Sequence, residues 1–102
     1  MTKISTFLST LRNDVFKLLP MKEAFNEGKD NHISEYIYSL IVTAEGALVT
    51  FKELETSKGY IYVVNNLNYL CLHENIEFSK WRKIILNCSR SLDDLSKSFG
   101  GK

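Results

Sequence analysis

The sequence contains few of the residues that build metal sites and disulfide frameworks. Its 102 residues include two cysteines, Cys71 and Cys88, and two histidines, His32 and His73. Two histidines are too few for a histidine-rich metal site, and no Cys-x-x-Cys pair is present. Both cysteines lie among apolar neighbours in helical patterns, so we expect buried free thiols in a reducing compartment. The sequence leaves open whether they form a disulfide.

Catalytic and nucleotide-binding motifs are also missing. The chain has no Walker loop, no Gly-x-Gly-x-x-Gly and no His-Glu-x-x-His. Asp93 and Asp94 are adjacent, but neighbours on a helix point about 100° apart and do not share a proton. We therefore expect no enzyme activity, no cofactor and no bound metal.

Long apolar runs are absent. Near the N-terminus polar residues interrupt the apolar ones every two or three positions, which indicates an amphipathic helix and not a signal peptide or membrane span. The formal net charge of +1 gives no overall field that favours nucleic acid or membranes. We expect a cytoplasmic protein without a membrane partner. The abundance of Lys, Asn, Ile and Ser is typical of AT-rich coding sequences and favours a bacterial or phage source.

Proline and glycine are scarce, at one and five residues, and no linker or internal repeat divides the chain. The length predicts a single domain over residues 1–102. The Gly-Gly-Lys end predicts fraying of residues 99–102. Six Phe, five Tyr and one Trp are spread along the sequence, so the chain has enough apolar surface to fold.

The first and last segments have the clearest helical patterns. Apolar residues alternate at spacings of three and four positions, which predicts helices over 3–19 and 77–98. They are Ile4, Leu8, Leu11, Val15 and Leu18 in the first segment, and Phe78, Trp81, Ile85, Cys88, Leu92, Leu95 and Phe99 in the last. Ser5 and Ser9 fall away from this stripe. Thr2 is suited to cap the first helix, and Pro20 predicts its end at Leu19, before a short helical turn over 21–26.

The middle of the chain is harder to assign. Residues 34–56 include strand-forming residues, but their apolar positions form one arc at helical spacing, and Leu40-Ile41-Val42 breaks strand alternation. This favours a helix that Ser34 caps and Lys58-Gly59 ends. Residues 60–73 fit either a helix or a β-hairpin with an Asn-Asn turn. We favour the helix because the neighbouring segments are helical.

Four helices with short connections predict an all-α fold, an antiparallel four-helix bundle. The alternative is an α+β fold in which a four-stranded meander separates the first helix from the last. Residues at the centres of the apolar stripes should be buried together. These core residues are Leu11, Val15, Ile41, Leu48, Trp81, Ile85 and Leu92.

The two middle helices carry more apolar residues than one buried stripe requires. The surplus residues are Tyr38, Val42 and Val49 in the second helix, and Ile61, Tyr62, Tyr69 and Leu72 in the third. One interpretation is that one of these helices is central in the domain, or that residues 60–73 form strands. The other is an interface rich in tyrosine, a residue enriched at binding surfaces, with Tyr38, Val42, Val49, Tyr62 and Tyr69 as the partner-binding residues.

The leading hypothesis is a small non-enzymatic protein-binding module. Adaptors, inhibitors, immunity proteins and chaperones of this kind act by stoichiometric interaction with another protein, and a homodimer would use the same surfaces. Residues 35–75 carry a net charge of −3 and residues 76–102 carry +3, which is typical of two solvated faces that attract each other. The alternative is a nucleic-acid-binding regulator, because three cations flank Trp81, and Arg90 and Lys97 continue the row from Lys83 at seven-residue spacing. Its phosphate contacts would be Lys80, Lys83, Arg90 and Lys97. Trp81 lies on the apolar stripe and is expected in the core, not under a stacked base.

Overall fold

The computed structural model describes residues 2–28, 32–73 and 76–100. Over these ranges the chain is helical between short connections and contains no strand. The elements are α1 (Lys3–Phe16), α2 (Leu18–Asn26), α3 (Ile33–Thr50), the 3-10 helix η1 (Lys52–Thr56), α4 (Lys58–Leu72) and α5 (Phe78–Gly100). The all-α prediction is confirmed, and the α+β alternative is wrong because both middle segments are helices.

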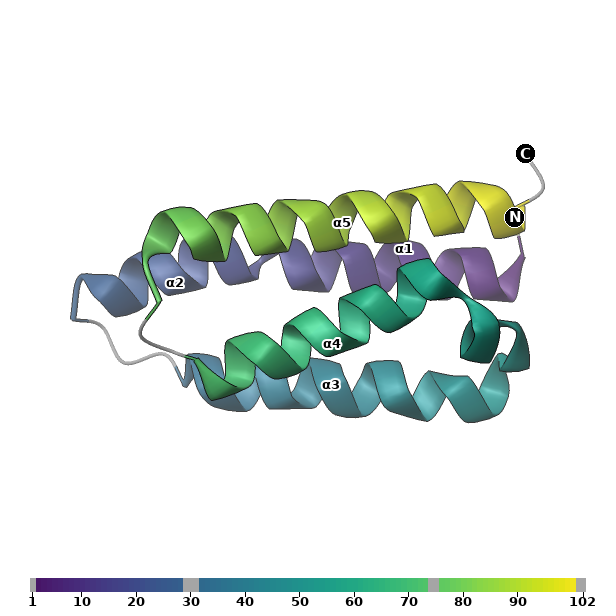
Figure 1. Cartoon of the computed structure of the whole chain (residues 1–102), viewed down its shortest axis with the longest axis horizontal. Coiled ribbons are helices and arrows are strands. Elements are labelled where there is room, and N and C mark those ends of the chain that lie inside the picture. The colour runs from purple at the N-terminus through teal and green to yellow at the C-terminus, as the bar shows by residue number, and fades with distance from the viewer. Residues whose placement is uncertain (1, 29–31, 74–75, 101–102) are drawn as a thin grey trace.

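Consecutive long helices run in opposite directions (Figure 1). α1 and α2 follow one another along one side, α3 returns, α4 runs back, and α5 returns beside α1. α4 lies between α3 and α5 and contacts both. The two ends of the described chain therefore meet, and the Thr2 hydroxyl donates to the carbonyl oxygen of Phe99 at 3.3 Å.

Pro20 breaks the first helix earlier than the sequence pattern predicted. Proline has no N–H, and its ring clashes with the carbonyl four residues before it, which belongs to Phe16. α1 therefore ends at Phe16 and α2 begins at Leu18, so that Pro20 lies in the first turn of α2. A first-turn N–H has no partner within the helix, so proline costs little there. The predicted end at Leu19 is wrong, and the expected short turn over 21–26 is part of the longer α2.

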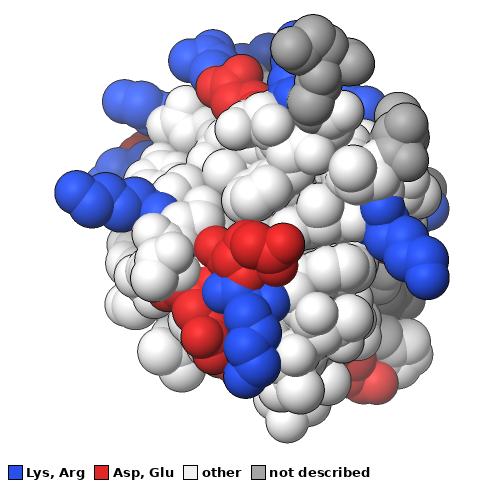
Figure 2. Space-filling model, turned by 90° about the vertical axis from the view of Figure 1, so that its right-hand side faces the viewer, with Lys and Arg blue, Asp and Glu red and all other residues white. Residues whose placement is uncertain are grey.

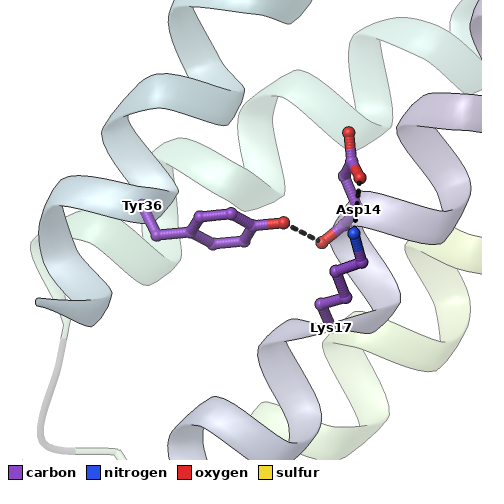
Figure 3. Close-up of polar contacts among 3 residues, drawn as sticks. All are labelled: Asp14, Lys17 and Tyr36. Carbon is purple, nitrogen blue, oxygen red and sulfur yellow. Dashed lines mark hydrogen bonds and ion pairs between the residues drawn. The ribbon is translucent and has the colours of Figure 1, made fainter. Parts of the chain in front are cut away.

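Tyr36 of α3 reaches across to this break (Figure 3). Its hydroxyl donates to the carbonyl oxygen of Asp14 at 2.9 Å, and Lys17 Nζ lies 3.4 Å from Asp14 Oδ1. Burial, and the nearby Asp14 charge, raise the pKa of Tyr36 above its ordinary value of 10.0. The hydroxyl therefore stays protonated as a donor and satisfies a carbonyl near the end of α1.

Hydroxyl side chains cap α1 and α4. Thr2 Oγ1 accepts from the backbone N–H of Ser5 at 3.1 Å, which confirms the predicted cap. Ser57 does the same for the N–H of Tyr60 at 3.3 Å. These bonds satisfy backbone donors that the first helical turn leaves without intrahelical partners.

The predicted boundaries of the second helix are wrong at both ends. α3 begins at Ile33, before Ser34, and His32 precedes it in the left-handed region at φ 54°. His32 Nδ1 lies 3.1 Å from a carboxylate oxygen of Glu35, which stands in the first turn near the positive end of the helix dipole. At the other end α3 stops at Thr50, and Gly59 belongs to the first turn of α4.

The core lies where α1, α3, α4 and α5 meet. Six of the seven predicted core residues are at most 5% exposed: Leu11, Val15, Ile41, Trp81, Ile85 and Leu92. Leu48 is only half-buried and packs against the edge of the core. Ala44 and Ala47 occupy the side of α3 that faces the core, and Val49 lies on the exposed side. Leu48 lies between these two sides of the helix and is therefore only partly covered.

A cluster of serines joins α1 to α5. Ser5 and Ser96 are 2% and 6% exposed, and their hydroxyls lie 3.0 Å apart. Ser96 Oγ also lies 2.9 Å from Ser9 Oγ and 3.0 Å from the carbonyl oxygen of Ser5. The expectation that Ser5 and Ser9 lie away from the stripe is wrong, because small residues let the two helices approach closely and the hydroxyls satisfy one another.

The C-terminal end of the described chain is docked. α5 continues to Gly100, and Phe99 packs against the core. The Phe99 side chain and the Thr2 hydrogen bond hold residue 99 against the rest of the chain, and the fraying of residues 99–102 stays a prediction. Residues 101 and 102 lie outside the described residues.

Candidate protein-binding surface

Large apolar side chains are exposed mainly on two helices that contact each other. In the described part of the chain eight large apolar side chains are exposed, and seven of them lie on α3 or α4. They are Tyr38, Val42 and Val49 on α3, and Ile61, Tyr62, Tyr69 and Leu72 on α4. The eighth, Phe16, ends α1. The five residues predicted to bind a partner are all among the seven, whereas burial at the centre of the domain would have covered them.

α3 is apolar on two opposite sides. Its inward side buries Ile37, Leu40 and Ala44 at 4% exposure or less. Tyr38, Val42 and Val49 are 62%, 52% and 76% exposed and are separated by four and seven residues, so they share one side of the helix. We call the exposed residues of this helix the α3 outer face: Glu35, Tyr38, Ser39, Val42, Thr43, Glu45, Gly46, Val49 and Thr50.

The C-terminal turn of α4 presents stacked rings. The rings of Tyr69 and His73 lie with centroids 4.1 Å apart and an interplanar angle of 18°. His73 Nδ1 donates to the carbonyl oxygen of Tyr69 at 2.9 Å, which fixes the imidazole on the ring. Leu72, next to His73 in the sequence, is 79% exposed. Tyr62 lies two helical turns before Tyr69, on the same side of α4 as Tyr69. The exposed side of α4 thus presents two tyrosines and a leucine, and the last turn adds the stacked imidazole.

The cations of the nucleic-acid hypothesis lie on the surface of α5. Lys80, Lys83, Arg90 and Lys97 are all exposed. Lys97 Nζ pairs with an Asp93 carboxylate oxygen at 3.2 Å, and the exposed Asp94 stands between Arg90 and Lys97 in the sequence. At the end of the molecule where α1 begins and α5 ends, basic and acidic groups lie side by side on a largely uncharged surface (Figure 2).

Trp81 is in the core, as predicted. It is 1% exposed, and the Nζ of the buried Lys22 lies 4.8 Å from its ring centroid. An indole in this position cannot stack on a base.

The cysteines are free thiols, so the disulfide left open by the sequence is not formed. Cys88 is fully buried, and burial raises the pKa of its thiol from 9.0 to about 12. A thiol with this pKa is not a nucleophile at neutral pH. Cys71 is half-buried on α4.

The described residues contain neither a metal-binding cluster nor a membrane-spanning helix. Residues 2–28, 32–73 and 76–100 contain no group of three or more His, Cys, Asp or Glu side chains placed to hold a metal ion. None of the helices in these ranges has the length and apolar character needed to cross a bilayer.

Comparison with known proteins identifies no relative. The chain matches no protein-family model, and no curated protein and no solved structure is significantly similar to it. The distribution of exposed side chains is therefore the feature from which function is inferred.

Proposed function

We propose that this protein is a non-enzymatic protein-binding module that acts by stoichiometric interaction through the exposed faces of α3 and α4. The observation that carries this proposal is the concentration of seven exposed large apolar side chains on these two helices. α5 exposes none over its described length. Exposed large apolar side chains are thus concentrated on α3 and α4 and are absent from α5 over its described length.

The energetics of exposure support this proposal. Covering a valine-sized or larger apolar side chain is worth about 1.5–3 kcal/mol, so leaving several uncovered forfeits stability in the isolated chain. A partner that covers them recovers this free energy at the interface. Tyrosine is also among the residues that contribute most to binding at interface centres, and three of the seven are tyrosines.

The low charge of these helices supports it as well. α4 has a single charged residue, Lys58, at its first position. α3 has two, Glu35 and Glu45. Interface centres are depleted in charged groups because each one must be desolvated on binding. An adaptor, inhibitor, immunity or chaperone role in the cytoplasm fits such a surface, and it requires neither a cofactor nor a catalytic group.

The nucleic-acid alternative has less support. Its best stacking residue, Trp81, is buried, and one of its four cations is already paired with Asp93. A phosphate-binding row would be stronger without the carboxylates that accompany it on α5.

Affinity capture with a matched pair of variants tests the proposal. Tagged wild type, Tyr38→Gln/Val49→Gln and Lys83→Gln/Arg90→Gln are used as baits in extracts of the source cells, and each is also sedimented alone. We expect the α3 variant to lose a partner, or self-association, that wild type and the α5 variant retain. Retention by the α3 variant and loss by the α5 variant would contradict the proposal and favour the basic face.

A further inference from the structure

We propose that the α3 outer face binds an amphipathic helix whose apolar stripe is flanked by Lys or Arg. This inference rests on the proposed function and specifies the chemistry of the partner. Three observations support it. Tyr38, Val42 and Val49 form an exposed apolar stripe along α3, the charges of α3 beside this stripe are acidic, and a second copy of this chain matches the stripe poorly.

The stripe has the dimensions of a helix-binding site. Tyr38 and Val49 are eleven residues apart, which is about 16 Å along a helix axis at about 1.5 Å per residue. Val42 lies between them on the same side. A partner helix covers this length in about three turns and can place anchors at positions i, i+4 and i+7 or i+11.

The two charged residues of α3 are both acidic and lie beside the stripe. At about 100° per residue, Glu45 lies about 40° to one side of the stripe and Glu35 about 40° to the other. Both are exposed, Glu35 with 80% of its side chain accessible. Among the described residues Glu45 forms no ion pair, and Glu35 pairs only with the exposed His32. Lysine or arginine on both edges of a partner helix would therefore meet carboxylates.

The short 3-10 helix that follows α3 is also negatively charged. η1 follows α3 directly and exposes Glu53 and Glu55 against one lysine, Lys52. An approaching cationic helix is thus attracted by several carboxylates, an effect that falls with ionic strength.

A second copy of this chain is a poorer match through its own α3 outer face and through α5. Paired face to face, two α3 outer faces would bring four carboxylates together without a cation, which costs free energy in a desolvated interface. The surface of α5 has cations, but over its described length it has no exposed large apolar side chain to cover Tyr38 or Val49. The face thus favours a partner that combines an apolar stripe with basic edges.

Two labelled synthetic peptides of about 18 residues, long enough to form a helix, provide the test. Both have leucine at helical stripe positions. One has lysine and the other glutamate at all flanking positions, and a scrambled lysine peptide controls for nonspecific attraction. Fluorescence anisotropy gives the Kd of each peptide for wild type, Glu35→Gln/Glu45→Gln, the charge-matched control Glu53→Gln/Glu55→Gln, and Tyr38→Gln/Val49→Gln.

We expect only the ordered lysine peptide to bind, with an affinity that falls as salt rises. Glu35→Gln/Glu45→Gln should weaken it by between about twofold and about thirtyfold, since exposed ion pairs are individually weak, and the control pair should weaken it less. Tyr38→Gln/Val49→Gln should abolish binding.

Equal binding of the glutamate peptide, or equal effects of the two carboxylate pairs, would overturn the cationic inference while leaving the proposed function intact. No peptide binding together with a dimer that Tyr38→Gln/Val49→Gln dissociates would replace the basic helix with a second copy. No peptide binding by a monomer that captures no partner would overturn both.

Discussion

In a chain this small, each large side chain buried in the core contributes a substantial part of the free energy of unfolding. Ile85 is 0% exposed on α5 and packs in the central cluster. Ile85→Ala should lower the free energy of unfolding by about 2–5 kcal/mol, because truncating a buried aliphatic side chain leaves a cavity. Lys83→Ala on the exposed side of the same helix should change it by less than about 0.5 kcal/mol. Equal losses for the two variants in urea titrations would show that this side of α5 does not face the core.

Buried ionisable groups make stability depend on alkaline pH. Burial raises the pKa of Cys88 from 9.0 to about 12 and raises that of Tyr60 well above 10.0. The unfolded chain therefore releases these protons at lower pH than the folded chain. The contribution of the neutral groups is complete below about pH 9 and is lost progressively as the pH rises above it.

Urea titrations between about pH 7 and about pH 11 measure this loss. Cys88→Ala removes the thiol contribution, so the decline of this variant should begin near pH 10, where tyrosine ionises in the unfolded chain. A wild-type free energy of unfolding that stays constant between about pH 9 and about pH 11 would contradict the burial of both groups.

At the scale of helices, one hydroxyl of α5 contacts several polar atoms of α1. Ser96 Oγ lies within 3.0 Å of the hydroxyls of Ser5 and Ser9 and of the Ser5 carbonyl oxygen. Ser96→Ala should lower the free energy of unfolding by about 1–3 kcal/mol, because buried polar atoms lose their partner. Ser98→Ala, at an exposed position of the same helix, is the control and should have little effect. Similar small losses for both would mean that the serine cluster contributes only shape.

Helix boundaries were harder to predict than helix identity. Apolar spacing identifies three of the four predicted helical segments, because the periodic pattern extends over many residues in each. The helix over residues 60–73 follows only from its helical neighbours, since its own pattern also fits a β-hairpin. The breaks depend on single contacts that a pattern does not contain. The sequence pattern predicts a helix end at Gly59, but a Cβ at this position would lie 3.0 Å from Ser91 Oγ on α5. Its role is to let α4 approach α5, where Ser91 donates to the Gly59 carbonyl oxygen at 3.0 Å.

The candidate surface could be located from the sequence in part. A count of apolar residues in excess of one stripe identified Tyr38, Val42 and Val49, and all three are exposed. The same reasoning could not detect the stacking of His73 on Tyr69 or the serine contacts, since these depend on how the helices end and pack. Ser5 and Ser9 have one indicator in the sequence, a four-residue spacing of small residues beside the apolar stripe of α1.

At the scale of the whole molecule, the central claim is that the apolar outer faces of α3 and α4 serve a partner and not the fold. The free energy of unfolding of Tyr38→Gln/Val49→Gln tests it most directly, with Ile37→Gln on the buried side of the same helix as the control. The double variant should stay within about 1 kcal/mol of wild type, because both side chains are more than half exposed. Ile37→Gln should lose more than about 2 kcal/mol, because it buries a polar group in the core. A loss of more than about 2 kcal/mol in the double variant would mean that these side chains pack within the domain, and would contradict the claim.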